Sequence, residues 1–151
     1  MKERYPNIKL EITTESTFVL HELLKSASIS MCISVSTCDQ AAIRNEEICH
    51  YPMQWVANPG IYNLEHIYSK RELIELPMID YLETSPSAVW LNKYFGEEFQ
   101  DRFINNTTNL MSTMIWLAES SLGVVAIPPK AIPQYIPDGR LGIVKTTVPL
   151  D

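Results

Sequence analysis

Residues 110–128, LMSTMIWLAESSLGVVAIP, join a helical pattern to a short apolar run, and this junction most constrains the fold. Apolar residues recur at three- and four-residue spacing up to Ala118, which predicts an amphipathic helix. Gly123 stands where a helix end needs a residue that tolerates positive φ. The apolar run 124–127 is typical of a strand covered on both faces, and Pro128 ends it. A helix that feeds a buried strand is a unit of an α/β sheet, and such sheets bind ligands at the carboxyl ends of their strands.

Composition narrows the class of protein. The chain has 151 residues, 46% hydrophobic and 20% charged, which suits one domain or two small lobes and excludes a disordered segment. The net charge is −6 and the basic residues are scattered, so this segment is a poor direct binder of nucleic acid. No apolar run reaches the length of about 18 residues that spans a membrane. The first residues lack the apolar core of a signal peptide, which favours the cytoplasm or a segment from which a leader was removed.

Side chains that carry catalytic or metal chemistry are sparse. The three cysteines, Cys32, Cys38 and Cys49, lack CxxC spacing and fit reduced thiols better than disulfides. The three histidines lie far apart in the sequence, so we expect no metal site and no cofactor. No GxSxG elbow and no glycine-rich phosphate loop occurs. The sequence therefore gives no positive case for an enzyme.

The order of expected elements indicates two lobes. Strands are expected at 8–12, 29–35, 53–57, 77–82, 103–104, 124–127 and 141–147. Helices are expected after Ser16, around 69–73, from Pro86, along 110–118 and around 131–135. This β-α-β-β and β-α-β-α-β-α-β order predicts two α/β lobes. The chain crosses between them near residues 55–58 and returns near 143–146, and a cleft between lobes is a common place for a ligand.

Several stretches, in this order, resemble a known family. They are RYPNIKLEI at 4–12, Leu23-Leu24 followed by 29–35, MQWVANP at 53–59, 118–128 and Gly139-Arg140-Leu141. Together they resemble the effector-binding domain of LysR-type transcriptional regulators. The resemblance implies an α/β fold of the two-lobed, type 2 periplasmic-binding-protein kind, truncated at both ends. Residues 1–55 and 144–151 would form lobe I, and 56–143 lobe II. The chain departs from the family at Ala27 and Ser120-Ser121, where glycine is common.

Hydroxyl-bearing residues at helix starts and strand ends are the candidate effector ligands. Ser16 and Thr17 begin one expected helix, and by resemblance they fall where the family contacts effectors. Thr84, Ser85 and Ser87 form the equivalent helix start in the second lobe, and Ser36 and Thr37 end a strand. Helix starts offer free N–H groups and a favourable field for anions. The alternative for each serine is simple helix capping, which uses the same groups.

The sequence thus predicts a cytoplasmic sensing domain that binds a small, anionic effector between two lobes. The resemblance implies homo-oligomers, and contact with DNA only through an N-terminal helix-turn-helix domain that these residues lack. A solute-binding protein of a transport system, which shares the fold, is the alternative. An enzyme with this fold is a third possibility, but it would need an acid, base or nucleophile in the cleft.

Overall fold

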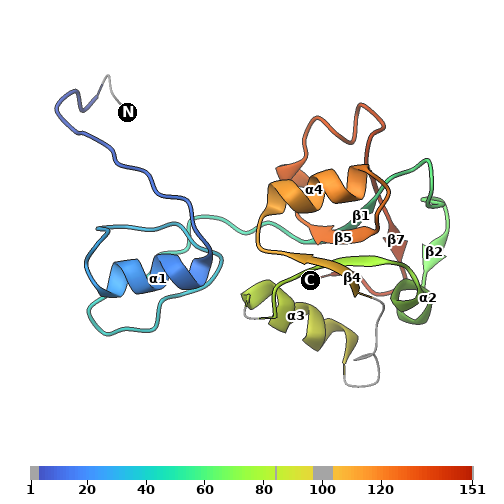
Figure 1. The fold of residues 1–151 in the computed structure, drawn as a ribbon, viewed down its shortest axis with the longest axis horizontal. Coiled ribbons are helices and arrows are strands. Elements are labelled where there is room, and N and C mark those ends of the chain that lie inside the picture. Colours follow the sequence, from blue (N-terminus) through green and yellow to red (C-terminus); the bar gives the residue numbers. More distant parts are fainter. Residues whose placement is uncertain (1–3, 84, 97–103, 151) are drawn as a thin grey trace. The chain divides into compact units, whose positions relative to one another are not determined.

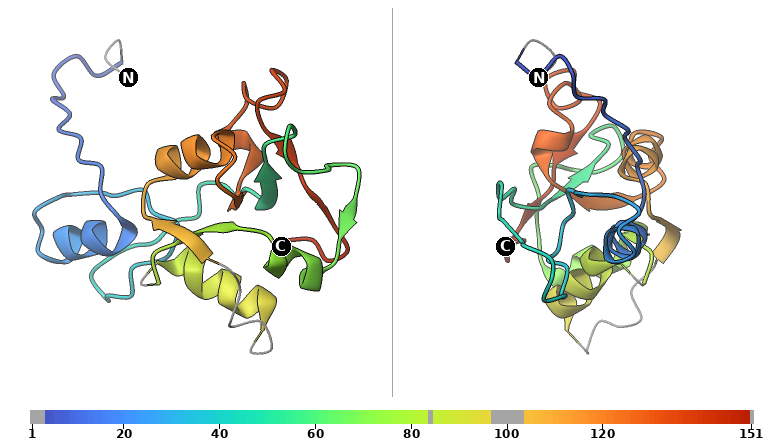
Figure 2. Two further views of the ribbon diagram at one scale, coloured as in Figure 1. Left: turned by 45° about the vertical axis from the view of Figure 1, so that its right-hand side comes forward. Right: turned by 90° about the vertical axis from the view of Figure 1, so that its left-hand side faces the viewer.

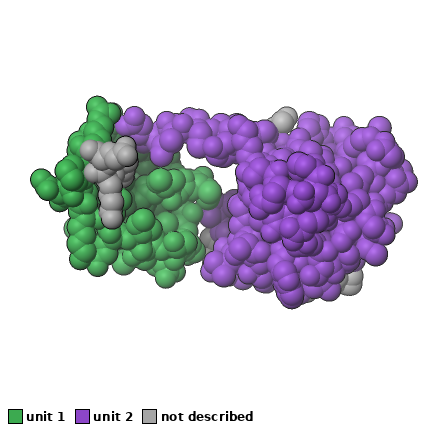
Figure 3. All heavy atoms as spheres, turned by 90° about the horizontal axis from the view of Figure 1, so that it is seen from above, with its two compact units in different colours: residues 1–45 green, residues 46–151 purple. Residues whose placement is uncertain are grey.

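The computed structural model describes residues 4–83, 85–96 and 104–150. The chain divides into two compact units, residues 1–45 and 46–151 (Figure 3). The expected lobe boundaries, 1–55 with 144–151 and 56–143, do not coincide with these units. Trp55, Val144 and Leu150 all belong to one buried cluster in the second unit.

The second unit is built on a five-stranded mixed sheet in the order β4-β3-β5-β1-β6 (Figure 1). Its strands are β1 (Gln54–Ala57), β3 (Met78–Tyr81), β4 (Ile104–Thr108), β5 (Val124–Ile127) and β6 (Gly142–Ile143). Strand β3 runs parallel to β4 and β5, whereas β1 runs antiparallel to β5 and β6. The expected strands at 53–57, 77–82 and 124–127 are confirmed. Strand β4 continues to Thr108, beyond the expected strand at 103–104, of which residue 103 lies outside the described residues.

Helices cover both faces of this sheet, α3 (Pro86–Phe95) on one and α4 (Met111–Glu119) on the other (Figures 1 and 2). Alternate residues of β5 point to opposite faces, as a strand requires. Val124 and Ala126 pack in the cluster that includes Phe95 of α3. Val125 and Ile127 pack with the buried face of α4. All four residues of β5 are therefore buried, as the uninterrupted apolar run predicts.

The link between α4 and β5 corrects the expectation for Gly123. Ser121 has the positive φ, +65°. It lies after the C-cap Ser120: its N–H donates to the carbonyl of Ala118, and the N–H of Leu122 donates to that of Leu117. This is a Schellman motif, in which the left-handed residue immediately follows the C-cap. Gly123 serves a different purpose, because a Cβ there would lie 2.6 Å from the carbonyl oxygen of Pro77.

Replacing Ser121 by glycine is expected to stabilise the second unit. A side chain in the left-handed region costs about 1–2 kcal/mol, which glycine avoids, and the extra freedom of glycine in the unfolded chain offsets part of the gain. We expect a net increase of about 1 kcal/mol in the free energy of unfolding, measured by urea denaturation. Ser120→Gly is the matched control, because Ser120 has a negative φ of −75°. Equal effects at the two positions would contradict the explanation.

The remaining elements of the second unit are short. Strands β2 (Ile67–Tyr68) and β7 (Lys145–Thr146) form a parallel pair, and Lys145 Nζ lies 2.7 Å from Glu65 Oε2. The single strand expected at 141–147 is thus divided between β6 and β7, which belong to different sheets. The helix expected around 131–135 is a 3-10 turn, η2 (Pro129–Ala131). Within the described residues, no helix is long and apolar enough to cross a bilayer.

Helix α2 (Lys70–Glu75), near the expected position, begins with a reciprocal cap. Ser69 Oγ accepts from the N–H of Glu72, and Glu72 Oε2 accepts from the N–H and the hydroxyl of Ser69, each at 2.7 Å. His66 Nε2 lies 2.9 Å from the other carboxylate oxygen. The backbone and hydroxyl hydrogen bonds from Ser69, followed by that from His66, lower the pKa of Glu72 to about 2.

This lowered pKa predicts an acid-dependent loss of stability. The Glu72 carboxylate stabilises the folded state fully above its ordinary pKa of 4.5, and the contribution disappears as the pH falls toward about 2. We expect the stability difference between the wild type and Glu72→Gln to shrink over that window in urea titrations. Glu75→Gln, at the far end of the helix, controls for general charge effects. A difference independent of pH would contradict the assignment.

The first unit contains one helix, α1 (Thr17–Lys25), with Ser16 as its N-cap as expected. The strands expected at 8–12 and 29–35 are wrong: neither segment belongs to a sheet. An isolated strand lacks hydrogen-bond partners, and the described part of this unit supplies no ladder. Their apolar residues are consequently exposed, for example Ile12 at 83% and Ile33 at 74%. Cys38 is buried, and the side chain of Asn45 hydrogen-bonds to both its backbone groups.

Candidate functional site

In the first unit, two candidate residues begin α1, and two lie at positions 36 and 37. Ser16 Oγ accepts from the N–H of Val19 at 3.4 Å, so the serine caps the helix, and Thr17 is its first residue. The carbonyl of Ser36 accepts from the hydroxyl of Ser34 at 2.7 Å, and that hydroxyl lies 3.1 Å from Nε2 of His21 on α1. The structure therefore connects the segment of Ser36 to α1. Thr37, the next residue, is exposed.

In the second unit, Ser85 begins α3 in the expected way. Its Oγ accepts from the N–H of Ala88 at 3.0 Å, and its own N–H donates to the carbonyl of Leu82 at 2.8 Å. Pro86 is the first helical residue, and Ser87, half-buried, follows in the first turn. The prediction for Thr84 lies outside the described residues. Capping occupies a lone pair of the Ser85 oxygen but leaves its proton free to be donated to a ligand.

The topology fixes the edge of the sheet at which α3 begins. The carboxyl ends of the parallel strands β3, β4 and β5 lie at one edge. Strand β1 is antiparallel to β5 and pairs Gln54 with Ile127, so β1 begins at that same edge. Helix α3 follows β3 after a short turn. The hydroxyls of this helix start and the first residues of β1 thus share the edge where α/β sheets bind ligands.

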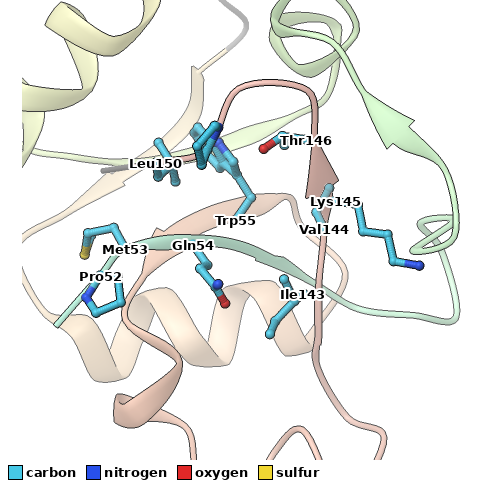
Figure 4. A pocket seen from close by; sticks show the side chains of 10 residues that line it. Pro52, Met53, Gln54, Trp55, Ile143, Val144, Lys145, Thr146 and Leu150 are labelled. Carbon is cyan, nitrogen blue, oxygen red and sulfur yellow. The ribbon is translucent and has the colours of Figure 1, made fainter.

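A pocket of about 330 Å³ lies beside the beginning of β1 (Figure 4). Ten residues of the second unit line it: Pro52, Met53, Gln54, Trp55, Ile143, Val144, Lys145, Thr146, Pro149 and Leu150. Most are apolar, while the Gln54 amide and the Thr146 hydroxyl provide polar groups. The side chain of Lys145 extends away from Trp55 in Figure 4, toward its ion pair with Glu65. The sequence predicted that the chain crosses between the two lobes near residues 55–58 and returns near residues 143–146. No sequence motif, however, indicates the pocket.

Helix α3 holds one wall of this pocket in place. Tyr94 Oη and Thr146 Oγ1 both donate to the carbonyl of Val148, each at 2.8 Å. The Trp55 ring packs on Phe95 and Tyr94, with ring centroids 5.7 and 6.2 Å away. Burial raises the pKa of Tyr94, and the neighbouring Trp55 and Thr146 side chains partly oppose that rise. The buried Trp55 Nε1 has no hydrogen-bond partner among the described residues.

In the part of the chain that the structure describes, no cluster of side chains is arranged to bind a metal ion, and the cysteines are unpaired. No group of three histidine, cysteine or acidic side chains is placed to hold a metal ion there. Cys32, Cys38 and Cys49 are free thiols, respectively half-buried, buried and exposed. The described residues instead place capping hydroxyls at the starts of α1 and α3.

Comparison of the sequence with known protein families identifies the family of this chain. The family described as the LysR substrate binding domain matches residues 1–150. No curated protein matches the sequence.

Three solved structures share the fold at low sequence identity. The regulatory domain of CcmR from Synechocystis PCC6803 in complex with 2-PG is 10% identical, with a TM-score of 0.84 over 99% of this chain and 72% of that one. The effector-binding domain of QuiR in complex with shikimate is 13% identical, with a TM-score of 0.78 over 97% and 69%. The bromide-bound regulatory domain of HypT from Salmonella typhimurium is 17% identical, with a TM-score of 0.73 over 97% and 71%.

Proposed function

The chain belongs to the LysR substrate-binding domain family, with its type 2 periplasmic-binding-protein-like α/β fold, and from this we propose that it senses a small anionic effector for a LysR-type transcriptional regulator. The observation that carries the proposal is the start of α3. Ser85 and Ser87 stand there at the carboxyl edge of the sheet. The related domains solved with bromide ion, 2-PG and shikimate support small-molecule sensing.

The helix starts of the two units supply the proposed ligands. Ser16 and Thr17 of α1, with Ser36 and Thr37, form the group in the first unit. Ser85 and Ser87, with Thr84, form the group in the second. Each capping serine keeps a hydroxyl proton for an anion, and the N-terminal end of each helix favours negative charge. No side chain of these groups is a strong base, so we propose binding without chemical turnover.

The effector acts by its differential affinity for two arrangements of the lobes. It shifts the population toward the arrangement that it binds better, and this change passes through a cytoplasmic homo-oligomer to helix-turn-helix domains outside these residues. Those domains make the contact with DNA. The solute-binding alternative is not favoured, because the family match is to the domain of the regulators.

Thermal unfolding with small anions tests the proposal. A ligand present at about a hundred times its Kd stabilises the native state by about 2.7 kcal/mol. We expect at least one anion among bromide, sulfate, phosphate and small carboxylates, shikimate included, to raise the Tm of the wild-type chain. An unchanged Tm with all of them would contradict an anionic effector.

Two substitutions of Ser85 separate capping from binding. Aspartate and threonine both cap helices, so Ser85→Asp and Ser85→Thr should keep α3 folded. Aspartate places a negative charge where the anion binds, whereas threonine keeps a hydroxyl. We expect the anion-dependent rise in Tm to disappear in Ser85→Asp and to persist in Ser85→Thr. Equal rises in the two variants would place the effector elsewhere.

A further inference from the structure

The pocket beside β1 is mainly apolar and presents no free charge. Seven of its ten lining residues are apolar: Pro52, Met53, Trp55, Ile143, Val144, Pro149 and Leu150. Lys145 is the only charged residue among the ten, and its ammonium group lies 2.7 Å from the carboxylate of Glu65. The volume of about 330 Å³ is at the lower end of the range for small-molecule sites. The pocket therefore suits a compact, uncharged molecule, because a buried charge without a partner is costly.

One polar group of the lining lacks a partner. Trp55 is 2% exposed, and its Nε1 is buried without a hydrogen-bond partner among the described residues. Buried donors are nearly always paired, so an unpaired one indicates where an acceptor belongs. In Figure 4 the side chain of Trp55 extends to the same side of β1 as Thr146 and Leu150, whereas that of Gln54 extends to the other side. The matching group on a ligand is thus an oxygen acceptor.

The hydroxyl groups near this wall of the pocket already donate hydrogen bonds. Thr146 Oγ1 and Tyr94 Oη both donate to the carbonyl of Val148, at 2.8 Å, and so hold the segment that leads to Leu150. Because Trp55 Nε1 is shielded from water, a ligand oxygen reaches it only when a side chain of the lining rotates. Leu150, which packs in the same buried cluster, has the flexible side chain that this movement requires.

This pocket is separate from the effector ligands proposed at the start of α3. Tyr94, which holds the wall of the pocket, lies nine residues after Ser85, and nine residues of helix extend about 14 Å. None of the hydroxyl residues proposed to bind the effector lines the pocket. The two places also differ in chemistry, because a helix start favours an anion and the pocket offers no free positive group.

We propose that the pocket beside Trp55 is a second binding site, for a small uncharged ring compound that carries a carbonyl or amide oxygen. The apolar walls cover the ring, and the oxygen accepts a hydrogen bond from the indole N–H of Trp55. The proposal does not depend on the effector function or on Ser85.

Benzamide, benzoate and toluene are matched probes of this site, because they share a ring and differ in charge and in the acceptor. Magnetic resonance of the whole, isotope-labelled chain follows the indole N–H signals of its three tryptophans. We expect benzamide to move the Trp55 signal downfield, as a new hydrogen bond does, and to leave the signal of Trp116, 60% exposed on α4, unchanged. Toluene should bind without this downfield shift. Benzoate should bind about tenfold more weakly than benzamide, or weaker still.

Trp55→Phe separates the hydrogen bond from the apolar contact. Phenylalanine keeps a ring and removes the donor, so we expect the Kd for benzamide to rise about fivefold and that for toluene to change little. Trp116→Phe is the matched control and should bind benzamide like the wild type. Ser85→Asp should do the same while it loses the response to anions, so a failure of either proposal is distinguishable from a failure of the other. Three outcomes would each overturn the second site: a Trp55 signal that millimolar benzamide does not move, equal affinities for benzamide and benzoate, or a benzamide affinity that Trp55→Phe leaves intact.

Discussion

Replacing Gly123 by alanine is expected to lower the free energy of unfolding of the second unit by about 3 kcal/mol. The new Cβ would lie 2.6 Å from the carbonyl oxygen of Pro77 and 3.1 Å from its carbonyl carbon. That oxygen also accepts the hydrogen bond from Val124 at 2.8 Å, which begins the pairing of β5 with β3. Relief of the overlap must therefore separate two central strands, because no flexible side chain can yield.

Two other glycines provide controls for the expected loss at Gly123. A Cβ at Gly142 would overlap Leu64 Cδ1, the end of a side chain that can rotate away. A Cβ at Gly139 would meet nothing, although its φ is +67°. We expect Gly142→Ala and Gly139→Ala each to cost about 1 kcal/mol, well below Gly123→Ala, in urea denaturation followed by circular dichroism. If Gly123→Ala costs no more than these two, the close approach of β5 to β3 is not what requires glycine.

Local signals in the sequence predicted the second unit better than the first. Strands β1, β3 and β5 lie beside one another, so each apolar run finds a partner within the described chain. The caps Ser16 and Ser85 were also predictable, because a cap depends only on the next few residues. Segments 8–12 and 29–35 show equally good alternation, yet alternation specifies a face and supplies no neighbour. They form no strands because the described residues supply no pairing partner for them, which a local pattern cannot reveal.

The candidate site was predictable only in part, for the same reason. Hydroxyl residues at helix starts are visible in the sequence, and the structure places Ser85 and Ser87 at the start of α3, beyond the carboxyl end of β3. The pocket beside Trp55 is different, because it brings together residues 52–55 and 143–150. No periodicity relates segments so far apart. Similarly, Gly123 was identified as special, but the reason lies in its approach to Pro77, a contact between separate strands.

Replacing Trp55 by alanine should produce the second large effect, a loss of about 4 kcal/mol in the free energy of unfolding. Trp55 is 2% exposed and packs on Phe95 and Tyr94, at the junction of β1, α3 and the pocket. Alanine would remove both ring contacts and leave a cavity beside the pocket. Because a loss of this size approaches the whole stability of a small domain, the unit would be partly unfolded at ordinary temperature.

Trp55→Phe and Trp116→Ala are the controls for the expected loss of stability in Trp55→Ala. Phenylalanine keeps much of the apolar surface, and the indole N–H that it removes has no hydrogen-bond partner among the described residues, so we expect a cost of about 2 kcal/mol. Trp116 is 60% exposed on α4, and Trp116→Ala should change stability by less than about 0.5 kcal/mol. Urea denaturation followed by far-ultraviolet circular dichroism measures all three variants. If the Trp55→Ala protein is as stable as Trp116→Ala, the contacts between Trp55 and α3 do not stabilise β1. The Tyr94 and Thr146 hydrogen bonds to Val148 would then have to maintain that wall of the pocket by themselves.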